Sequence, residues 1–227
     1  IKLNSIDSEI KYINSSFPVH KQIENLKSLS ITSIITEKQK KTSINKKDLF
    51  ENFNKKTFLV TGGGGTIGSE ICRQLLRYRP KKIIILDNSE YNLFQTFYNL
   101  SNNYFFQKKN IEISLKLSDI QNDKAINQIF SENEKINYVF HAAAYKHVKL
   151  GEENKKNFAM NNINGTYVIL NNCIKFNVEN FVNISTDKAV NPTTFMGKTK
   201  RFNEIMVKSF AKNNNLNLSS VRFGNVL

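Results

Sequence analysis

From residue 57 onward, the chain alternates short apolar runs with longer amphipathic stretches. The apolar runs have the length and the β-branched or aromatic content of buried strands, and the stretches between them repeat apolar residues at helical spacing. Regular strand–helix alternation indicates parallel strands joined by right-handed crossovers. The pattern predicts an α/β fold with a doubly wound parallel sheet. Strands are expected at residues 57–61, 81–87, 110–117, 136–144, 180–186 and 217–223, and helices at residues 67–79, 90–101, 123–133, 157–176 and 194–213.

Residues 1–50 lack this alternation. They are rich in Ser, Lys, Ile and Asn and show no sustained period, so we expect a linker or the tail of an upstream domain. The stretch EKQKKTSINKKDLFENFNKK reads as a charged connector with at most one short helix. Residues 51–227 are expected to form one folded domain. The chain opens on Ile1 and stops at Leu227 directly after an apolar run, so we expect it to be a fragment of a longer protein.

The chain is strongly basic, with a formal net charge of +14 at pH 7. The excess is mainly lysine scattered among asparagines, and no basic stripe interleaves with aromatic residues. We therefore expect no nucleic-acid partner. The charge instead predicts a solvated, lysine-rich surface that attracts an anionic substrate.

The sequence shows neither a membrane segment nor a metal motif. No run of about 18 apolar residues is present, and no signal peptide is recognisable, so we expect no membrane contact by this chain. Cys72 and Cys173 lie far apart and form no metal or disulfide spacing with each other or with the three histidines His20, His141 and His147. This usage is typical of a reduced, cytoplasmic domain without a metal.

The stretch VTGGGGTIGSE follows a predicted strand and opens a predicted helix, which is the context of a dinucleotide-binding loop. Two glycine registers fit, one beginning at Gly63 and one at Gly62, and both continue through Gly65 and Gly68. In either register the backbone approaches a pyrophosphate at the helix N-terminus. We expect this loop to contact the cofactor through Gly62, Gly65, Thr66, Ile67 and Gly68.

Asp87 strengthens this interpretation, because it ends the second predicted strand about twenty residues after the loop. A carboxylate there accepts hydrogen bonds from both ribose hydroxyls and repels a 2′-phosphate, which favours NAD over NADP. The alternative is that Asp87 is simply a solvated residue at the end of a strand.

A second candidate segment, HAAAYKHV, follows the fourth predicted strand. Ala142, Ala143 and Ala144 would let a flat cofactor lie against the backbone. Lys146, in the loop that follows, either faces the substrate or is simply exposed. We also expect Asp119 and Ile120, after the third strand, to contact the cofactor.

The glycine loop, LDNSEYNLF, FHAAAYKHV, NNINGTY and ISTDKAVNPTTFMGKTKR together closely resemble the polysaccharide-biosynthesis branch of nucleotide-sugar 4,6-dehydratases. These are extended short-chain dehydrogenase/reductases that act on UDP-N-acetylglucosamine. The resemblance covers residues 57–227 and implies an NAD-binding Rossmann domain, expected to stop before the C-terminal part that closes over the substrate. It also implies a homo-oligomer and a UDP-sugar substrate.

The resemblance implies roles for individual residues. Thr186, Asp187 and Lys188 match the catalytic threonine and acid/base pair, and Lys200 matches the lysine of the Tyr-x-x-x-Lys turn. Met196 holds the place of the tyrosine. The long, membrane-anchored subgroup of this family is similar there, so the resemblance implies activity, and a cytoplasmic domain whose parent is associated with the inner membrane. The residues matched to the substrate site are Asn162, Arg222 and Asn225.

The expected reaction removes water from a UDP-N-acetylhexosamine to give a 4-keto-6-deoxy sugar. Asp187 would protonate the departing C6 oxygen and Lys188 would take the C5 proton. Because Met196 carries no exchangeable proton, we expect Thr186 to orient the C4 oxygen while Lys200, or a water that it holds, helps the C4 proton leave. Lys200 is also expected to bind the nicotinamide ribose of the cofactor. Two alternatives stay open: a nucleotide-sugar 4-epimerase, and a catalytically inactive NAD-binding domain. Activity of this chain alone is expected to be weak or absent.

Overall fold

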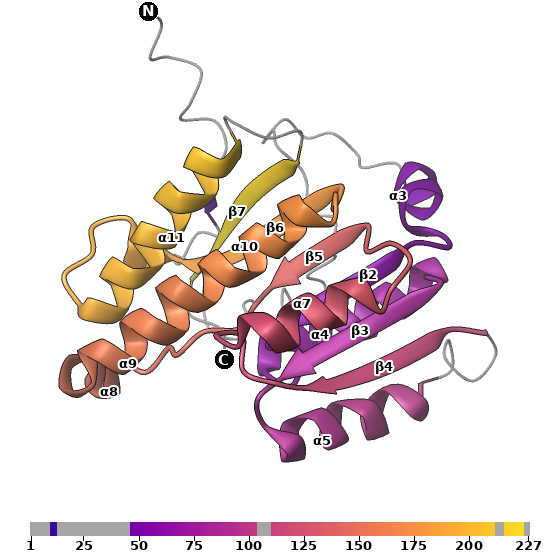
Figure 1. The fold of residues 1–227 in the computed structure, drawn as a ribbon, viewed down its shortest axis with the longest axis horizontal. Coiled ribbons are helices and arrows are strands. Elements are labelled where there is room, and N and C mark those ends of the chain that lie inside the picture. Colours follow the sequence, from indigo (N-terminus) through magenta and orange to yellow (C-terminus); the bar gives the residue numbers. More distant parts are fainter. Residues whose placement is uncertain (1–9, 13–45, 104–109, 212–215, 225–227) are drawn as a thin grey trace, which may run out of the picture.

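The computed structural model describes residues 10–12, 46–103, 110–211 and 216–224. At its centre is a seven-stranded sheet in the order β1-β7-β6-β5-β2-β3-β4, with every neighbouring pair parallel (Figure 1). The strands are β1 (Ile10–Tyr12), β2 (Thr57–Thr61), β3 (Lys82–Asp87), β4 (Glu112–Leu117), β5 (Tyr138–His141), β6 (Asn180–Thr186) and β7 (Asn217–Phe223).

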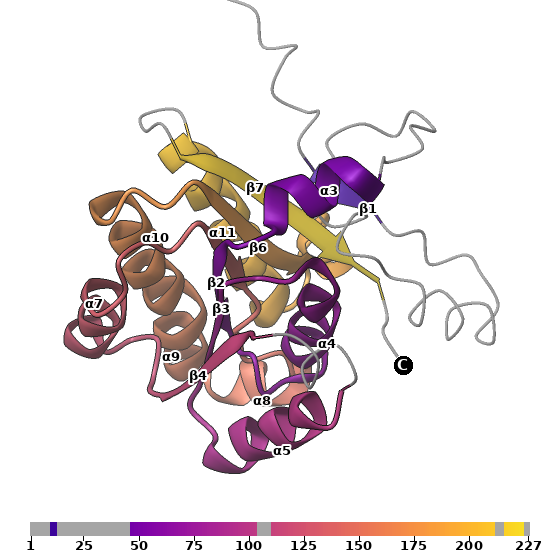
Figure 2. The same cartoon turned by 90° about the vertical axis from the view of Figure 1, so that its right-hand side faces the viewer.

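Helices cover both faces of this sheet (Figure 2). One apolar core lies between the sheet and α3, α4 and α5, and the other lies between the sheet and α7, α10 and α11. The helices are α3 (Lys46–Phe53), α4 (Thr66–Leu75), α5 (Glu90–Ser101), α7 (Asp123–Ser131), α8 (Val148–Glu153), α9 (Lys155–Ala159), α10 (Gly165–Lys175) and α11 (Phe195–Ala211), and the tighter or wider turns are η2 (Leu76–Tyr78), η3 (Met160–Asn164) and η4 (Asp187–Ala189).

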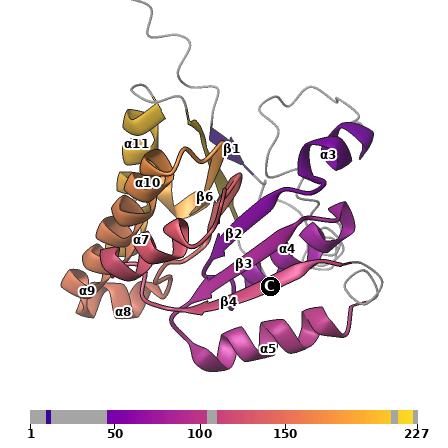
Figure 3. The same ribbon diagram turned by 45° about the vertical axis from the view of Figure 1, so that its right-hand side comes forward.

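The chain crosses from one half of the sheet to the other after β4, so that β2 and β5 are neighbours (Figure 3). In doubly wound sheets, ligands bind outside the carboxyl ends of the strands at this switch point. The observed architecture confirms the predicted fold class. It also places the glycine loop after β2 and the alanine segment after β5 on opposite sides of the same crevice.

Three elements differ from the sequence prediction. The predicted helix at 157–176 is divided, because the π-helical turn η3 separates α9 from α10. A seventh strand, β1, lies within the segment that was expected to be a linker or the tail of an upstream domain, and it pairs with β7 with Ile10 opposite Ser220. The short helix α8 was not anticipated either.

Helix α3 is part of the folded domain. It crosses the predicted boundary between residues 50 and 51, and its Leu49 and Phe53 side chains are buried in the core. The ring of Phe53 makes edge contacts with Phe58, Tyr78 and Tyr138 at centroid distances of 5.0 to 5.4 Å. The short helix that the sequence allowed in this connector is therefore anchored by aromatic packing.

Candidate active site

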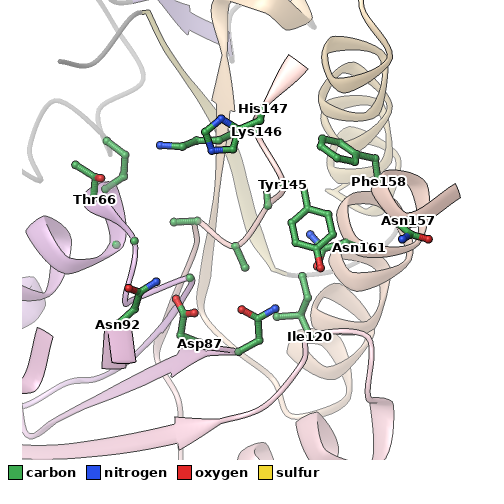
Figure 4. Close-up of a pocket in the computed structure, with 18 of the residues that line it drawn as sticks. Thr66, Asp87, Asn92, Ile120, Tyr145, Lys146, His147, Asn157, Phe158 and Asn161 are labelled. Carbon is green, nitrogen blue, oxygen red and sulfur yellow. The ribbon is translucent and has the colours of Figure 1, made fainter. Parts of the chain in front are cut away.

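A pocket of about 460 Å³ opens at the switch point, between the ends of β2, β3 and β5 and the start of α9 (Figure 4). Small residues and backbone form one wall, and polar side chains of the β5–α8 loop and of α9 form the other. The expected cofactor residues that line it are Gly62, Gly65, Thr66, Ile67, Gly68, Asp87, Ile120, Ala142, Ala143 and Ala144, and Lys146 lines it as well.

The glycine loop has its shape because several of its residues lack a side chain. Gly62 has a φ of +65°, and a Cβ there would lie 2.5 Å from the backbone nitrogen of Ala143. A Cβ at Gly68 would collide with the carbonyl oxygen of Gly62. Gly65 caps α4 without a side-chain hydrogen bond, so the first-turn amides have no side-chain acceptor from the cap. The N-terminus of α4 at the pocket wall therefore suits an anionic group.

Asp87 connects this loop to the end of β3. Its Oδ2 accepts a hydrogen bond from the amide of Gly64 at 2.9 Å, and its Oδ1 accepts one from the amide of Ser89 at 3.0 Å. These two bonds fix the carboxylate at the pocket wall. Each oxygen keeps a second lone pair with which to accept from a ligand hydroxyl.

Asp119 and Ile120 differ in their placement. Ile120 lines the pocket and packs against Gly165 of α10, where a Cβ would lie 2.5 Å from the Ile120 Cδ1 atom. The carboxylate of Asp119 instead accepts hydrogen bonds from the backbone and side-chain nitrogens of Gln121, at 2.8 and 3.1 Å. Asp119 thus shapes the turn after β4, and its neighbour Ile120 is in the pocket wall.

Asn162 is fully buried and braces the pocket loop. Its Oδ1 accepts from the amide of Tyr145 at 2.8 Å, and its Nδ2 donates to the carbonyl of Tyr145 at 3.0 Å and to Thr199 Oγ1 at 2.9 Å. Asn162 was expected to bind the substrate, and in the structure its side chain is enclosed among these protein partners. Its side chain fixes the backbone of the Tyr145–His147 segment, whose three residues all line the pocket.

Thr186, Asp187 and Lys188 meet at the turn that follows β6. Thr186 Oγ1 donates to Asp187 Oδ1 at 2.9 Å, and Lys188 Nζ lies 3.4 Å from the same oxygen. Their side chains do not line the pocket, but β6 is the parallel neighbour of β5, with Asn183 opposite His141. The turn therefore lies at the same edge of the sheet as the alanine segment. The carboxylate of Asp187 and the amine of Lys188 are thus within hydrogen-bond distance, so that a proton can pass directly between them.

Met196 and Lys200 lie on the first turns of α11 and are buried. Lys200 Nζ donates to the carbonyl oxygen of Ile184 at 2.8 Å. Burial lowers the pKa of Lys200 from 10.5 to about 8, while the nearby carboxylate of Glu204 acts in the opposite direction. A lysine with this pKa exchanges protons close to neutral pH, as a proton-transfer role requires.

Arg222 is a correction to the sequence prediction. It was expected to touch the substrate, but it is only 2% exposed, and its guanidinium is engaged by Glu204. Its Nε donates to Glu204 Oε1 at 2.7 Å and its Nη2 donates to Oε2 at 2.6 Å. A buried arginine in a bidentate ion pair cannot leave its partner without exposing an unpaired charge. Asn225 lies outside the described residues.

His141 is a buried polar residue that the sequence analysis did not interpret. Its Nδ1 lies 2.7 Å from Thr61 Oγ1 and its Nε2 lies 2.9 Å from Thr166 Oγ1. Since Thr166 donates its own proton to the carbonyl of Asn162, the imidazole Nε2 is the donor to Thr166 and Nδ1 accepts from Thr61. Burial lowers the pKa of His141 to about 3, with a further contribution from Lys200. The ring is neutral and ties β2 to α10 through β5.

No helix in the described part of the chain is long and apolar enough to cross a membrane. The same residues contain no group of three or more His, Cys, Asp and Glu side chains placed to bind a metal ion. Cys72 and Cys173 are both buried and unlinked.

The parallel sheet order and the glycine-loop pocket define a Rossmann domain of the short-chain dehydrogenase/reductase type. Residues 58–227 match the family model described as "Polysaccharide biosynthesis protein". The chain is 44% identical over 173 residues to the capsular polysaccharide biosynthesis protein CapD of Staphylococcus aureus, covering 76% of this chain and 28% of the relative. The chain belongs to this polysaccharide biosynthesis family.

Two further comparisons extend the likeness. A UDP-N-acetylglucosamine 4,6-dehydratase (inverting) of Campylobacter jejuni is 30% identical over 181 residues, which are 77% of this chain and 50% of the relative. The X-ray structure of Pen from Bacillus thuringiensis superimposes with a TM-score of 0.69 at 34% identity, covering 77% of this chain and 52% of that one. The chain thus spans about half, or less, of the length of these proteins.

Proposed function

We propose that this chain is the NAD-binding catalytic part of a nucleotide-sugar 4,6-dehydratase that acts on a UDP-N-acetylhexosamine in polysaccharide biosynthesis. The observation that carries the proposal is the Thr186–Asp187–Lys188 cluster, hydrogen-bonded within itself at the sheet edge that also holds the glycine loop and Asp87. Family membership and the likeness to the Campylobacter dehydratase support it.

The residues around the pocket fit NAD. The glycine loop leaves room for a pyrophosphate at the start of α4, and Asp87 holds a fixed carboxylate where a ribose would lie. Bound NAD would supply reversible hydride removal at C4 of the sugar and hydride return at C6. Because a carboxylate repels a 2′-phosphate, Asp87 favours NAD over NADP.

The remaining chemistry is proton transfer by the protein. Oxidation at C4 makes the C5 hydrogen acidic, and Lys188 in its neutral form would remove it. Asp187, protonated, would donate to the departing C6 oxygen. Since Lys188 Nζ lies 3.4 Å from Asp187 Oδ1, the two groups can share the proton that the elimination moves from C5 to water.

The methionine at position 196 leaves the C4 hydroxyl without a phenol. Thr186 Oγ1, at the turn after β6, would orient the C4 oxygen, and the lowered pKa of Lys200 supports a role in removing the C4 proton, directly or through a water. This route makes Lys200 functional even though position 196 carries only a thioether. It predicts that a Thr186→Val, Lys200→Met double variant is inactive.

In the decisive experiment, the full-length protein that contains this chain is incubated with UDP-N-acetylglucosamine, and the sugar is followed by NMR. A 4-keto-6-deoxy product, absent in Lys188→Ala, supports the proposal. Exposed Lys198, two residues before Lys200 on α11, provides a matched control, and Lys198→Ala should keep full activity. A product inverted at C4 without loss of water would make the protein an epimerase and overturn the proposal. NAD binding without any UDP-sugar turnover would indicate an inactive domain.

The sequence resemblance also leads us to propose a homo-oligomer, a parent protein with membrane association, and a C-terminal part that completes the UDP-sugar pocket. These points concern the whole protein. Size-exclusion chromatography with light scattering on the full-length parent tests the first of them, and a single-chain mass would exclude it.

A further inference from the structure

Glu204, on α11, is 2% exposed at its side chain and lies one helical turn after Lys200. Its carboxylate accepts four hydrogen bonds: two from Arg222 at 2.7 and 2.6 Å, one from Ser185 Oγ at 2.7 Å and one from Arg201 Nη1 at 3.2 Å. A fully buried carboxylate is costly unless it is paired and hydrogen-bonded in this way. The arrangement is therefore built around Glu204.

The contacts of Glu204 converge just below the proposed catalytic turn. Ser185 immediately precedes Thr186, and it is register-paired with Arg222 on the neighbouring strand β7. Lys200 holds the preceding residue of β6 through the carbonyl of Ile184. Helix α11 is thus fastened to two consecutive residues of β6, by an amine at Ile184 and by a carboxylate at Ser185.

A third contact fixes the other side of the turn. Gly197 of α11 faces the carbonyl oxygen of Lys188, and a Cβ at this glycine would lie only 2.6 Å from that oxygen. The start of α11 therefore packs directly on the turn that carries Asp187 and Lys188. Any shift of α11 relative to β6 would move these two residues.

We propose that Glu204 is a positioning residue, which acts through Ser185 and Arg222 to hold the Thr186–Lys188 turn and the amine of Lys200 in register at the end of β6. The effect of Glu204 on catalysis rests on the proposed function. Its effect on the position of the turn at residues 186–188 does not. Arg222 contributes to the same positioning, because it neutralises Glu204 and ties it to β7.

Glu204 and Arg222 should also change the pKa of Lys200, because both carry a charge close to it. The ionisable groups around Lys200 are Glu204 and Arg201 on α11, Arg222 on β7, Asp187 and Lys188 at the turn, and the imidazole of His141 on β5, which is neutral. The carboxylate of Glu204 raises the pKa of Lys200 against the lowering effect of burial. Removal of the Glu204 charge should lower the pKa of Lys200 further, and removal of the Arg222 charge should raise it. Shifts of opposite sign would show that the charges of Glu204 and Arg222 both act on the amine of Lys200.

The test is an NMR titration of lysine-labelled protein, with the Lys200 signal assigned by its loss in Lys200→Arg. In Glu204→Gln the midpoint should fall below the parent value of about 8, and in Arg222→Gln it should rise above the parent value. Glu179→Gln is the matched control, because Glu179 is also paired with two cationic side chains, here Lys56 and Lys135, but lies next to the opposite end of β6. Its midpoint should stay at the parent value.

Two further variants keep the proposal testable if a single variant does not fold. The double variant Glu204→Gln, Arg222→Gln removes both charges and should titrate near the parent value. Ser185→Ala removes only the hydrogen bond between Glu204 and β6, and should shift the backbone amide signals of residues 186–188. Where the parent turns over substrate, Ser185→Ala should lower kcat on the order of tenfold with little change in KM.

The outcomes separate the two proposals. Shifts of the same sign in Glu204→Gln and Arg222→Gln, or unchanged amide signals in Ser185→Ala, would overturn the positioning role of Glu204. Neither measurement needs substrate. A failed activity assay with opposite-sign titration shifts would therefore count against the dehydratase proposal and leave the positioning role intact.

Discussion

The two halves of the sheet build their parts of the site from different materials. On the β2–β3 side, the pocket wall consists largely of backbone and very small residues, such as Gly62 and Gly65, and Asp87 is the one carboxylate among the described residues that line it. On the β6–β7 side, long polar side chains are buried beneath the turn at residues 186–188, among them Lys200, Glu204 and Arg222. The first half is an open surface that is ready to receive a ligand. The second half is a closed network that holds reactive groups in place.

This difference shows how the halves respond to change. The β2–β3 side depends on the absence of atoms, so adding a methyl group should be the most damaging substitution there. The β6–β7 side depends on partners, so removing a charged or hydroxyl group should be the most damaging there. Substitutions of each kind can therefore separate binding of the cofactor from chemistry on the sugar.

The largest effect is expected for Gly68→Ala. The added Cβ would collide with the carbonyl oxygen of Gly62, so α4 must move away from the loop, and binding of NAD should be lost together with several degrees of thermal stability. Gly65→Ala is the matched control for thermal stability, since its Cβ would meet the same oxygen at 3.3 Å and needs only a small adjustment. Calorimetric titration with NAD and thermal unfolding of both variants provide the measurement. Equal losses in the two variants would contradict this account.

The second largest effect is expected for Lys188→Ala. Turnover should fall by about 10² to 10⁴, the usual cost of losing a general base, while affinity for NAD stays at the parent value. The reason is that Lys188 lies on the β6–β7 side and does not line the pocket. Steady-state kinetics and NAD titration on the full-length parent check both halves of this statement. A loss of NAD affinity equal to the loss of turnover would show that the two sides are not separable.

Elements with strong local signals were predictable from the sequence. The strands at 57–61, 180–186 and 217–223 and the helix at 90–101 were predicted with the bounds that the structure shows. Each is a run with one clear period. Strand β1 carried no such signal, because three residues become a strand only by pairing with β7.

The parts of the candidate site also differ in how well the sequence predicted them. That the glycine loop and Asp87 line one pocket could be predicted, because glycine spacing and a carboxylate at a strand end are local features of the sequence. The environment of Arg222 could not, since its partner Glu204 lies 18 residues earlier on another element and only the fold brings the two together. Asn162 likewise turned out to hold Tyr145, 17 residues away, because its three hydrogen bonds to Tyr145 and Thr199 depend on two other segments of the chain.

The third largest effect is expected from a change of pH, which acts through His141 on β5, between the two sides of the sheet. His141 is neutral and buried with a pKa of about 3, whereas an unfolded histidine titrates near 6.5. Below pH 6.5 the histidine binds a proton in the unfolded chain but stays neutral in the folded chain. The free energy of unfolding therefore falls by about 1.4 kcal/mol for each unit by which the pH is lowered, down to pH about 3. Between pH 6.5 and 5 the loss should reach about 2 kcal/mol.

Urea unfolding at pH 7.5 and at pH 5 measures this loss. His141→Asn should start from lower stability, because Thr61 and Thr166 lose their ring partner, but its stability should depend less on pH. His147→Asn, in the exposed pocket loop, serves as the control and should keep the parent pH dependence. An unchanged pH dependence in His141→Asn would assign the effect to other groups.

The smallest effect is expected for Asp87→Asn, and it tests whether the open side discriminates by charge. The substitution keeps the size of the side chain, but it removes the carboxylate that accepts from Gly64 and Ser89 and that would accept from the ribose. Hydrogen bonds to a charged group contribute about 1.5 to 3 kcal/mol, so NAD affinity should fall at least about tenfold. NADP affinity should fall less or rise, because the repulsion of its 2′-phosphate is relieved. Exposed Glu90, three residues further on, is the matched control, and Glu90→Gln should change neither affinity. If Asp87→Asn weakened both cofactors equally, the carboxylate would be only a brace for the glycine loop, and the preference for NAD would have to come from the shape of the pocket.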